Sequence, residues 1–274
     1  MAARRSESLL LHAALAVGAA LTLFPLLWML SASFMTSGEA TTYPPHLVPH
    51  AATLAQYRQL LVRLNVGRAF FSSAVIAIVV TAGSVLFSSM AGYAFAKLRF
   101  PGRERLFGIL LIGLVIPPQV GMLPLFLFMK QLHLVNTYWG VIIPSLATIF
   151  GIFLVRQFML SIPQELLEAA RIDGASEFRI YWSVVLPTAR PILATLATFM
   201  FMSTWNDFMW PLIILSDQSH HTLPVAIANL VGEHVLDVEL MMASSVVTVI
   251  PVLLLFVVLQ RYYIAGIMSG SVKG

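Results

Sequence analysis

The sequence contains no cysteine and few charged residues. Without cysteine, the chain has no disulfide, no thiolate nucleophile and no cysteine-ligated metal site. Only 10% of its 274 residues are charged and 59% are hydrophobic, whereas about a quarter of the residues in a soluble domain are charged. This composition excludes an ordinary soluble domain and predicts that lipid surrounds much of the chain.

Motifs that carry enzyme chemistry are also absent. The sequence has no G-x-x-x-x-G-K-[ST] phosphate loop, no H-E-x-x-H zinc motif, no G-x-S-x-G nucleophile elbow and no pair of membrane aspartates. The spacing of His220, His221 and His234 fits no zinc pattern, and a solvated loop is the preferred interpretation. We therefore predict no catalytic residue and no metal site, and an intramembrane enzyme is the least favoured class of function.

Long apolar stretches dominate the chain. Each is close to the ~20 residues that carry a helix across the hydrocarbon of a bilayer. Residues 1–274 are therefore predicted to form a single all-α transmembrane domain with about six spans. The expected spans are Leu9–Phe34, Phe70–Ala96, Leu106–Met129, Tyr138–Phe158, Pro191–Leu215 and Leu240–Tyr263.

The basic residues indicate how the chain is oriented. If the N-terminus is cytoplasmic, six spans place twelve of the sixteen Lys and Arg residues inside, which is where such residues accumulate. Both termini of this multi-pass protein are therefore expected in the cytoplasm. The first span also resembles a signal peptide ending at Ser31-Ala32-Ser33, but its apolar run exceeds the ~7 to 15 residues of such a peptide. Cleavage is the less favoured alternative.

Two spans carry features beyond hydrophobicity. In the second, Ser84, Ser88, Gly92 and Ala96 recur every four positions and so share one helix face. Close packing against another helix is the preferred interpretation of this face, and contact with a polar substrate is the alternative. In the third, Pro117-Pro118 predicts a kink, which is either a gate beside a cavity or a purely structural bend.

The polar stretch at residues 156–190 predicts two short helices on the cytoplasmic side. Ser161 with Pro163 is a plausible helix start, and Gly174 can end that helix in the left-handed conformation. A second helix is expected to start at Ser176. Two short helices joined at a glycine make a compact knob, which packs on itself, lies at the lipid interface or binds a partner.

The second of these helices is expected to end before Pro187, since proline cannot continue the hydrogen-bond ladder of a helix. Early acidic residues, Glu165 and Glu168, suit the first helix because its dipole favours negative charge near the N-terminus.

A motif in residues 156–190 resembles one that a known family carries in its coupling loop, and we use that name for these residues. Glu168-Ala169-Ala170 is followed after three residues by Gly174 and after nine more by Val184-Val185-Leu186-Pro187, as in the EAA loop of ABC importer permeases. That family usually has isoleucine in place of Val184, a conservative departure. Together with similar stretches elsewhere, the chain resembles the maltose-type carbohydrate permeases, in particular the smaller six-span subunit. These stretches are SSMAGYAFAKLRFPGR, IPPQVGMLPLF, TWNDFMWPLI and QRYYIAGIMSGSVKG.

This resemblance implies a type I ABC importer permease in a bacterial or archaeal cytoplasmic (inner) membrane. The implied partners are a second homologous permease, two copies of a cytoplasmic ATPase, an extracytoplasmic solute-binding protein, membrane lipid and a sugar substrate, with no nucleic acid. ATP and magnesium are then bound by the ATPase subunits, so this chain is not an enzyme and binds no cofactor. The implied ATPase-coupling residues are Glu168, Ala169, Ala170, Asp173, Gly174, Leu186 and Pro187.

A candidate substrate path lies in the fifth span. Trp205, Asn206, Asp207 and Trp210 combine aromatic faces with planar polar groups, which is what sugar binding requires. The alternative is that Asn206 and Asp207 cap or crosslink helices. Because no Lys or Arg sits well inside any expected span, a neutral sugar, oligosaccharide or polyol is favoured over a sugar phosphate.

An ion-coupled secondary transporter is the alternative function. Such proteins commonly show internal repeats and several ionisable groups inside the membrane, whereas this chain shows no evident repeat and one clear carboxylate. The EAA-like motif has no role in such a protein. The resemblance therefore favours an ATP-driven importer.

Overall fold

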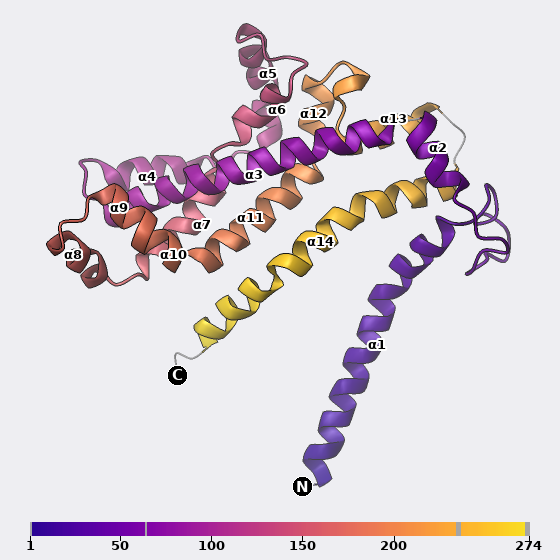
Figure 1. Cartoon of the computed structure of the whole chain (residues 1–274), viewed down its shortest axis with the longest axis horizontal. Helices are drawn as coiled ribbons and strands as arrows, with labels where there is room; N and C mark the ends of the chain where they lie inside the picture. The colour runs from indigo at the N-terminus through magenta and orange to yellow at the C-terminus, as the bar shows by residue number, and fades with distance from the viewer. Residues whose placement is uncertain (1, 64, 234–236, 272–274) are drawn as a thin grey trace. The chain divides into compact units, whose positions relative to one another are not determined.

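The computed structural model describes residues 2–63, 65–233 and 237–271, and within these ranges the chain forms helices and no strand (Figure 1). The α-helices are α1 (Ala2–Ala32), α2 (Ala55–Arg63), α3 (Val66–Lys97), α4 (Arg103–Ile112), α5 (Met122–Gln131), α6 (Tyr138–Ser145), α7 (Ile149–Leu160), α8 (Gln164–Ile172), α9 (Glu177–Ile180), α10 (Leu186–Thr188), α11 (Arg190–Trp205), α12 (Met209–Ile214), α13 (Leu223–Glu233) and α14 (Val238–Ser271). Two 3-10 turns, η1 (Pro118–Gly121) and η3 (Gln218–His220), and one π-helical turn, η2 (Tyr181–Val185), complete the described elements.

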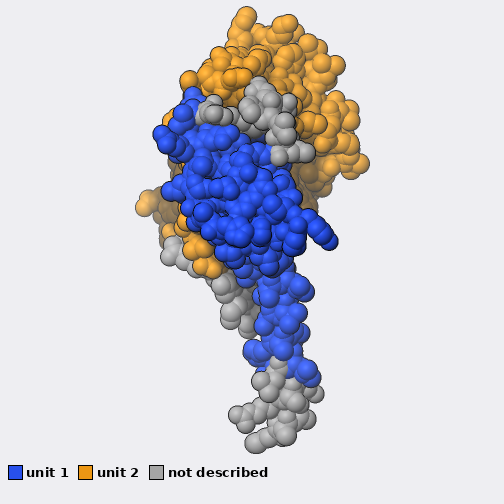
Figure 2. All heavy atoms as spheres, turned by 90° about the vertical axis from the view of Figure 1, so that its right-hand side faces the viewer, with its two compact units in different colours: residues 1–67, 226–251 blue, residues 68–225, 252–274 orange. Residues whose placement is uncertain are grey.

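The chain divides into two compact units, which Figure 2 colours blue and orange. Unit 1 consists of residues 1–67 and 226–251, and unit 2 of residues 68–225 and 252–274. Whether residues 1–274 act as a single permease domain, as the sequence suggests, stays a prediction.

Four helical segments of the described chain are long and apolar enough to cross a membrane: Leu10–Ala32, Val66–Lys97, Tyr138–Leu160 and Val238–Val258. They correspond to the first, second, fourth and sixth expected spans. A fifth candidate is the bent pair Glu177–Thr188 and Arg190–Trp205, whose two parts meet at 80°. The fold is therefore that of an all-α membrane protein, while the count of six spans stays a prediction.

The expected third span, Leu106–Met129, is not one continuous helix. α4 ends at Ile112, Pro117 has an extended backbone (φ −60°, ψ 131°), and the 3-10 turn η1 starts at Pro118. Neither proline can donate a backbone hydrogen bond, so the helix cannot be propagated through this pair. The kink predicted from the sequence is a complete break, and residues 114–121 within it are all exposed.

Unit 1 has a small core of its own. Ala32, Met35 and Ala40 are buried, and partly buried hydrophobic residues pack against them: Trp28, Val238 and Met242. The carboxylate of Glu239, 1% exposed, accepts a hydrogen bond from the Ala40 N–H at 2.6 Å. In contrast, the most apolar stretch of α1 buries none of its residues within the chain.

A buried carboxylate organises the loop that follows α1. Glu39 accepts hydrogen bonds from the backbone N–H groups of His50 (2.6 Å) and Thr36 (3.0 Å). These bonds hold the pKa of Glu39 below its ordinary value, with the His50 N–H as the largest cause. The loop therefore has a fixed conformation centred on one carboxylate.

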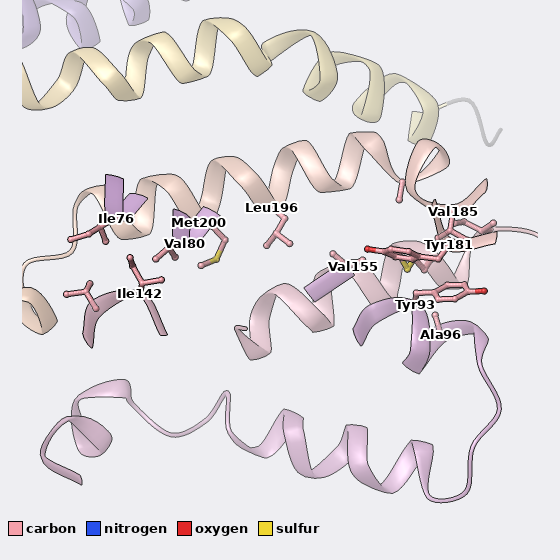
Figure 3. Packing of buried hydrophobic residues seen from close by; sticks show 14 of the residues in the cluster. Ile76, Val80, Tyr93, Ala96, Ile142, Val155, Tyr181, Val185, Leu196 and Met200 are labelled. Carbon is pink, nitrogen blue, oxygen red and sulfur yellow. The ribbon is translucent and has the colours of Figure 1, made fainter. Parts of the chain in front are cut away.

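The core of unit 2 lies where α3, α7 and α11 pack together (Figure 3). Ile76 and Val80 of α3, Val155 of α7, and Leu196 and Met200 of α11 are among its buried residues. Two threonines fix where neighbouring helices begin, because the hydroxyls of Thr137 and Thr148 accept from N–H groups at the starts of α6 and α7.

Glycine lets α3 and α7 approach closely. A Cβ added to Gly92 of α3 would lie 2.9 Å from the Cγ1 of Val155, and one added to Gly151 of α7 would lie 2.6 Å from the Oγ of Ser88. Ser84 and Ser88 are both fully buried. The close packing predicted for the small-residue face of the second span is therefore confirmed.

Candidate coupling site

The first helix of the coupling loop is α8, and it ends as the sequence predicts. Gly174 has φ +78°, which an L-residue rarely adopts. The N–H of Gly174 donates to the carbonyl of Arg171 and the N–H of Ala175 donates to that of Ala170, both at 3.0 Å. These bonds satisfy the last carbonyls of the helix and reverse the chain direction.

The second helical segment starts at Ser176, whose hydroxyl accepts from the Arg179 N–H at 3.3 Å. It runs through α9, the π turn η2 and α10. The expectation that the helix ends before Pro187 is wrong, because Pro187 lies inside α10 and the helix continues to Thr188. The widened turn directly before Pro187 already interrupts the regular bonding pattern, so its missing N–H is tolerated there.

The coupling loop is hydrogen-bonded to the end of α3 through a buried tyrosine. Tyr93, 4% exposed, donates its hydroxyl to an oxygen of the Glu177 carboxylate at 2.7 Å. The other oxygen of Glu177 accepts from the Nε of Arg171 at 2.6 Å. One carboxylate thus joins α3, α8 and α9. The bond to Glu177 also raises the pKa of Arg171.

Two further bonds join the same two segments. The hydroxyls of Ser89 and Tyr181 are 2.7 Å apart, and the Nζ of Lys97 donates to the carbonyl of Ile162 at 2.6 Å. Ser89 gives its own proton to the carbonyl of Leu86, so Tyr181 is the donor to Ser89. We call the bonds made by Ser89, Tyr93 and Lys97 the α3 ladder.

The sequence reasoning missed the α3 ladder. Ser89, Tyr93 and Lys97 are spaced by four and so share one helix face, directly beside the small-residue face described above. Polar side chains recurring every four positions at the end of an apolar span are a signal that could have identified them. Their partners Glu177 and Tyr181 carry no such signal, because only the fold brings the loop back to α3.

The predicted coupling residues differ in how exposed they are. Glu168, Ala169, Asp173, Gly174 and Pro187 are exposed, whereas Ala170 and Leu186 are partly buried against the core of unit 2. Leu167 is fully buried and fixes one side of α8 to that core.

Apolar side chains are exposed beside these residues. Ile172 is 86% exposed and Phe178 is 65% exposed, and Phe178 packs edge-on against Trp182. Exposed large hydrophobic side chains next to small residues on a short helical knob are typical of a docking surface.

The predicted substrate-path residues are mostly packed within the protein. Trp205 is 1% exposed, stacks on Phe201 and meets Phe70 edge-on. Trp210 is 6% exposed and donates its ring N–H to the Gly140 carbonyl at 3.0 Å. The two tryptophans therefore contribute to packing in this conformation.

Asp207 and Asn206 lie between α11 and α12. Asp207 is partly buried, and its carboxylate accepts from the Trp210 N–H at 3.5 Å. Asn206 is exposed and donates to the Met202 carbonyl at 2.8 Å. These contacts fit the capping alternative, and a role for the four residues in substrate passage stays a prediction.

The structure shows no group of three or more His, Asp or Glu side chains that could hold a metal ion, among residues 2–63, 65–233 and 237–271. The expectation of a solvated loop is wrong for His221, which is 9% exposed, whereas His220 is partly exposed and packs edge-on against Tyr138. His234 lies outside the described residues.

Comparison with protein families places most of the chain in one group. Residues 84–268 match the family model described as binding-protein-dependent transport system inner membrane component.

Similar proteins span nearly the full chain. The arabinooligosaccharides transport system permease protein AraQ of Halalkalibacterium halodurans is 39% identical over 278 residues, covering 99% of this chain and all of the relative. The lactose transport system permease protein LacG of Rhizobium radiobacter is 32% identical, with 98% of each chain covered. The sn-glycerol-3-phosphate transport system permease protein UgpE of Brucella abortus is 30% identical, covering 97% of this chain and 98% of the relative.

A solved structure has the same fold. The crystal structure of a bacterial ABC transporter involved in the import of the acidic polysaccharide alginate contains a chain that matches with a TM-score of 0.82 and 26% identity. The match covers 94% of this chain and 97% of that one.

Proposed function

The chain belongs to the family of binding-protein-dependent transport system inner membrane components, and from this premise we propose that it helps to import a neutral sugar, oligosaccharide or polyol. It is the permease of an ABC importer and not an ion-coupled transporter. With a second, homologous permease it forms the translocation path.

The preference for a neutral substrate is supported by where the cations lie. Within the four described spans, Arg68 and Lys97 lie at the two ends of α3, and Arg156 lies near the end of α7. A permanently charged phosphate would need a cationic partner well inside the membrane. The names of the relatives include neutral oligosaccharides and lactose as well as glycerol phosphate.

The coupling loop is proposed to dock on a cytoplasmic ATPase subunit. The observation that carries this proposal is the knob of α8 and α9, which exposes Glu168, Ala169 and Ile172 while Leu167 fixes it to the core. Small residues allow close approach of a partner, and the exposed apolar side chains supply area to bury.

The remaining partners follow from the same assignment. Two ATPase subunits bind ATP and magnesium and carry out hydrolysis, since this chain has no phosphate loop. A solute-binding protein delivers the sugar from the outer side. Both termini and the coupling loop then face the cytoplasm.

Reconstitution tests this proposal directly. The chain is purified with its second permease and ATPase subunits, placed in liposomes, and supplied with its binding protein and a panel of neutral and phosphorylated sugars. We expect a neutral sugar to stimulate ATP hydrolysis and to accumulate inside the vesicles. Uptake driven by an ion gradient without ATP, or stimulation by sugar phosphates alone, would contradict it.

A further inference from the structure

The α3 ladder has a consequence for how the importer works. We propose that Tyr93 and its ladder neighbours are positioning residues that make α3 the span that moves with the coupling loop. This inference rests on the proposed coupling role of residues 156–190. It assigns the transmission of movement from the coupling loop to α3 to three side chains of one helix face, Ser89, Tyr93 and Lys97.

The connections made by Lys97 and Tyr93 are both charge-assisted, and that of Tyr93 ends on a charged side chain of the coupling loop. The Tyr93 hydroxyl is held in a nearly buried position and donates to a carboxylate, and hydrogen bonds to charged groups are stronger than neutral ones. Arg171 of α8 holds the same carboxylate from the other side. A displacement of α8 is therefore transmitted to α3 through the Glu177 carboxylate, which both Arg171 and Tyr93 contact.

A second connection lies one helical turn away. Tyr181 donates to Ser89, and the rings of Tyr93 and Tyr181 are 5.7 Å apart (Figure 3). Tyr181 is also the first residue of the π turn η2. Such turns are rare and are often found at functional sites.

The body of α3 can carry the displacement further. It is one helix of 32 residues, and its contacts with α7 at Gly92 are too tight for a methyl group. A rigid helix transmits a shift at one end along its whole length. The chain itself also joins the loop to spans, through α7 before it and through α11 after it, and it bends by 80° between α10 and α11.

The experiment compares single hydroxyl deletions in the reconstituted importer. Tyr93→Phe and Tyr181→Phe each remove one oxygen from the ladder and keep the aromatic ring. Tyr138→Phe is the matched control, because Tyr138 makes the same kind of bond to Ser72 of α3, 2.7 Å long, at the opposite end of this helix. The measurements are the yield of assembled complex, ligand-stimulated ATP hydrolysis, and sugar molecules imported per ATP hydrolysed.

We expect Tyr93→Phe to lower the sugar imported per ATP by about tenfold and Tyr181→Phe by about threefold, the scale set by a charge-assisted and a neutral hydrogen bond. Tyr138→Phe should leave this ratio unchanged, and all three variants should assemble. In a Glu177→Ala background, Tyr93→Phe should have no further effect, because Tyr93 acts through this carboxylate.

Three results would overturn the inference. One is that Tyr93→Phe imports as much sugar per ATP hydrolysed as the Tyr138→Phe control. Another is that Tyr93→Phe lowers this ratio further in the Glu177→Ala background. The third is a loss of assembly in Tyr93→Phe that accounts for its lost uptake, which assigns the bond to the fold. Gly174→Val distinguishes a failure of this inference from a failure of the proposed function. If Gly174→Val uncouples ATP hydrolysis from uptake while Tyr93→Phe does not, the coupling role of residues 156–190 stands and the role of the α3 ladder is refuted.

Discussion

Replacing Gly174 by valine perturbs the coupling loop through its backbone alone. Gly174 has φ +78°, and a Cβ at this position would meet nothing within 4 Å. An added Cβ therefore causes no clash, and the main cost is the left-handed conformation. For an L-residue this cost is on the order of 1–2 kcal/mol, which corresponds to about a five- to thirty-fold change in an equilibrium constant.

This strain acts on the turn that follows the Glu168-Ala169-Ala170 helix. We expect Gly174→Val to insert and assemble with the second permease while its association with the ATPase weakens, or while hydrolysis continues without uptake. Gly174→Asn should recover most of the activity, since asparagine tolerates this conformation better than other side chains. The assay is uptake and ligand-stimulated ATP hydrolysis in liposomes, together with ATPase subunit retained on purification.

Gly102 provides a matched control. It has φ +79°, it also has no atom within 4 Å of an added Cβ, and it lies in the turn between α3 and α4. Gly102→Val carries the same backbone strain outside the coupling loop and should retain coupled uptake. Normal uptake and normal stimulated hydrolysis in Gly174→Val, or equal defects in both variants, would refute the assignment of α8 as the coupling helix.

Three further predictions concern topology, packing and pH. Single cysteines replacing the exposed residues Ser176 and Thr42 in this cysteine-free chain should label differently in intact cells. Only the cysteine at 42 should react with an impermeant reagent, and the reverse pattern would contradict cytoplasmic termini. Trp205→Ala should lower the free energy of unfolding by about 3–5 kcal/mol and reduce the yield of complex, because the ring is fully packed. Asn206→Ala, in contrast, should assemble and lower transport. Full transport by Asn206→Ala would remove this residue from the substrate path. Since the folded-state pKa of Glu39 lies below its ordinary 4.5, its bonds stabilise the loop fully above that pH and lose this effect as the pH falls through the folded value. Protection factors for hydrogen exchange of residues 36–50, which correct for the pH dependence of the intrinsic rate, should therefore fall with acid in the native chain more than in Glu39→Gln, and equal profiles would contradict this role.

Much of the fold could be predicted because single side chains determine local structure. The left-handed turn at Gly174, the cap at Ser176 and the break at Pro117-Pro118 each depend on one residue type and its neighbours. The small-residue face of α3 was predictable for the same reason, since its spacing alone places it on one side of a helix.

Other features depend on contacts between distant segments. Nothing in the local sequence shows that Glu177 accepts a hydrogen bond from Tyr93, which lies 84 positions earlier in the chain. The continuation of the helix through Pro187 depends on the π turn before it, which local propensity does not predict. For Trp205, the sequence suggested substrate contact, and only the neighbouring rings show that the side chain is packed.

The break in the third span also bears on how cells make this protein. Irregular backbone is tolerated at membrane depth only where protein covers it or where it lines a water-filled cavity. Segment 114–121 is exposed within this chain, so if residues 106–129 cross the membrane as predicted, a copy inserted without the proposed second permease would present it to lipid. We expect such orphan copies to be recognised by quality-control proteases of the membrane. Balanced synthesis of the two permeases is then a requirement of biogenesis, set by a pair of prolines.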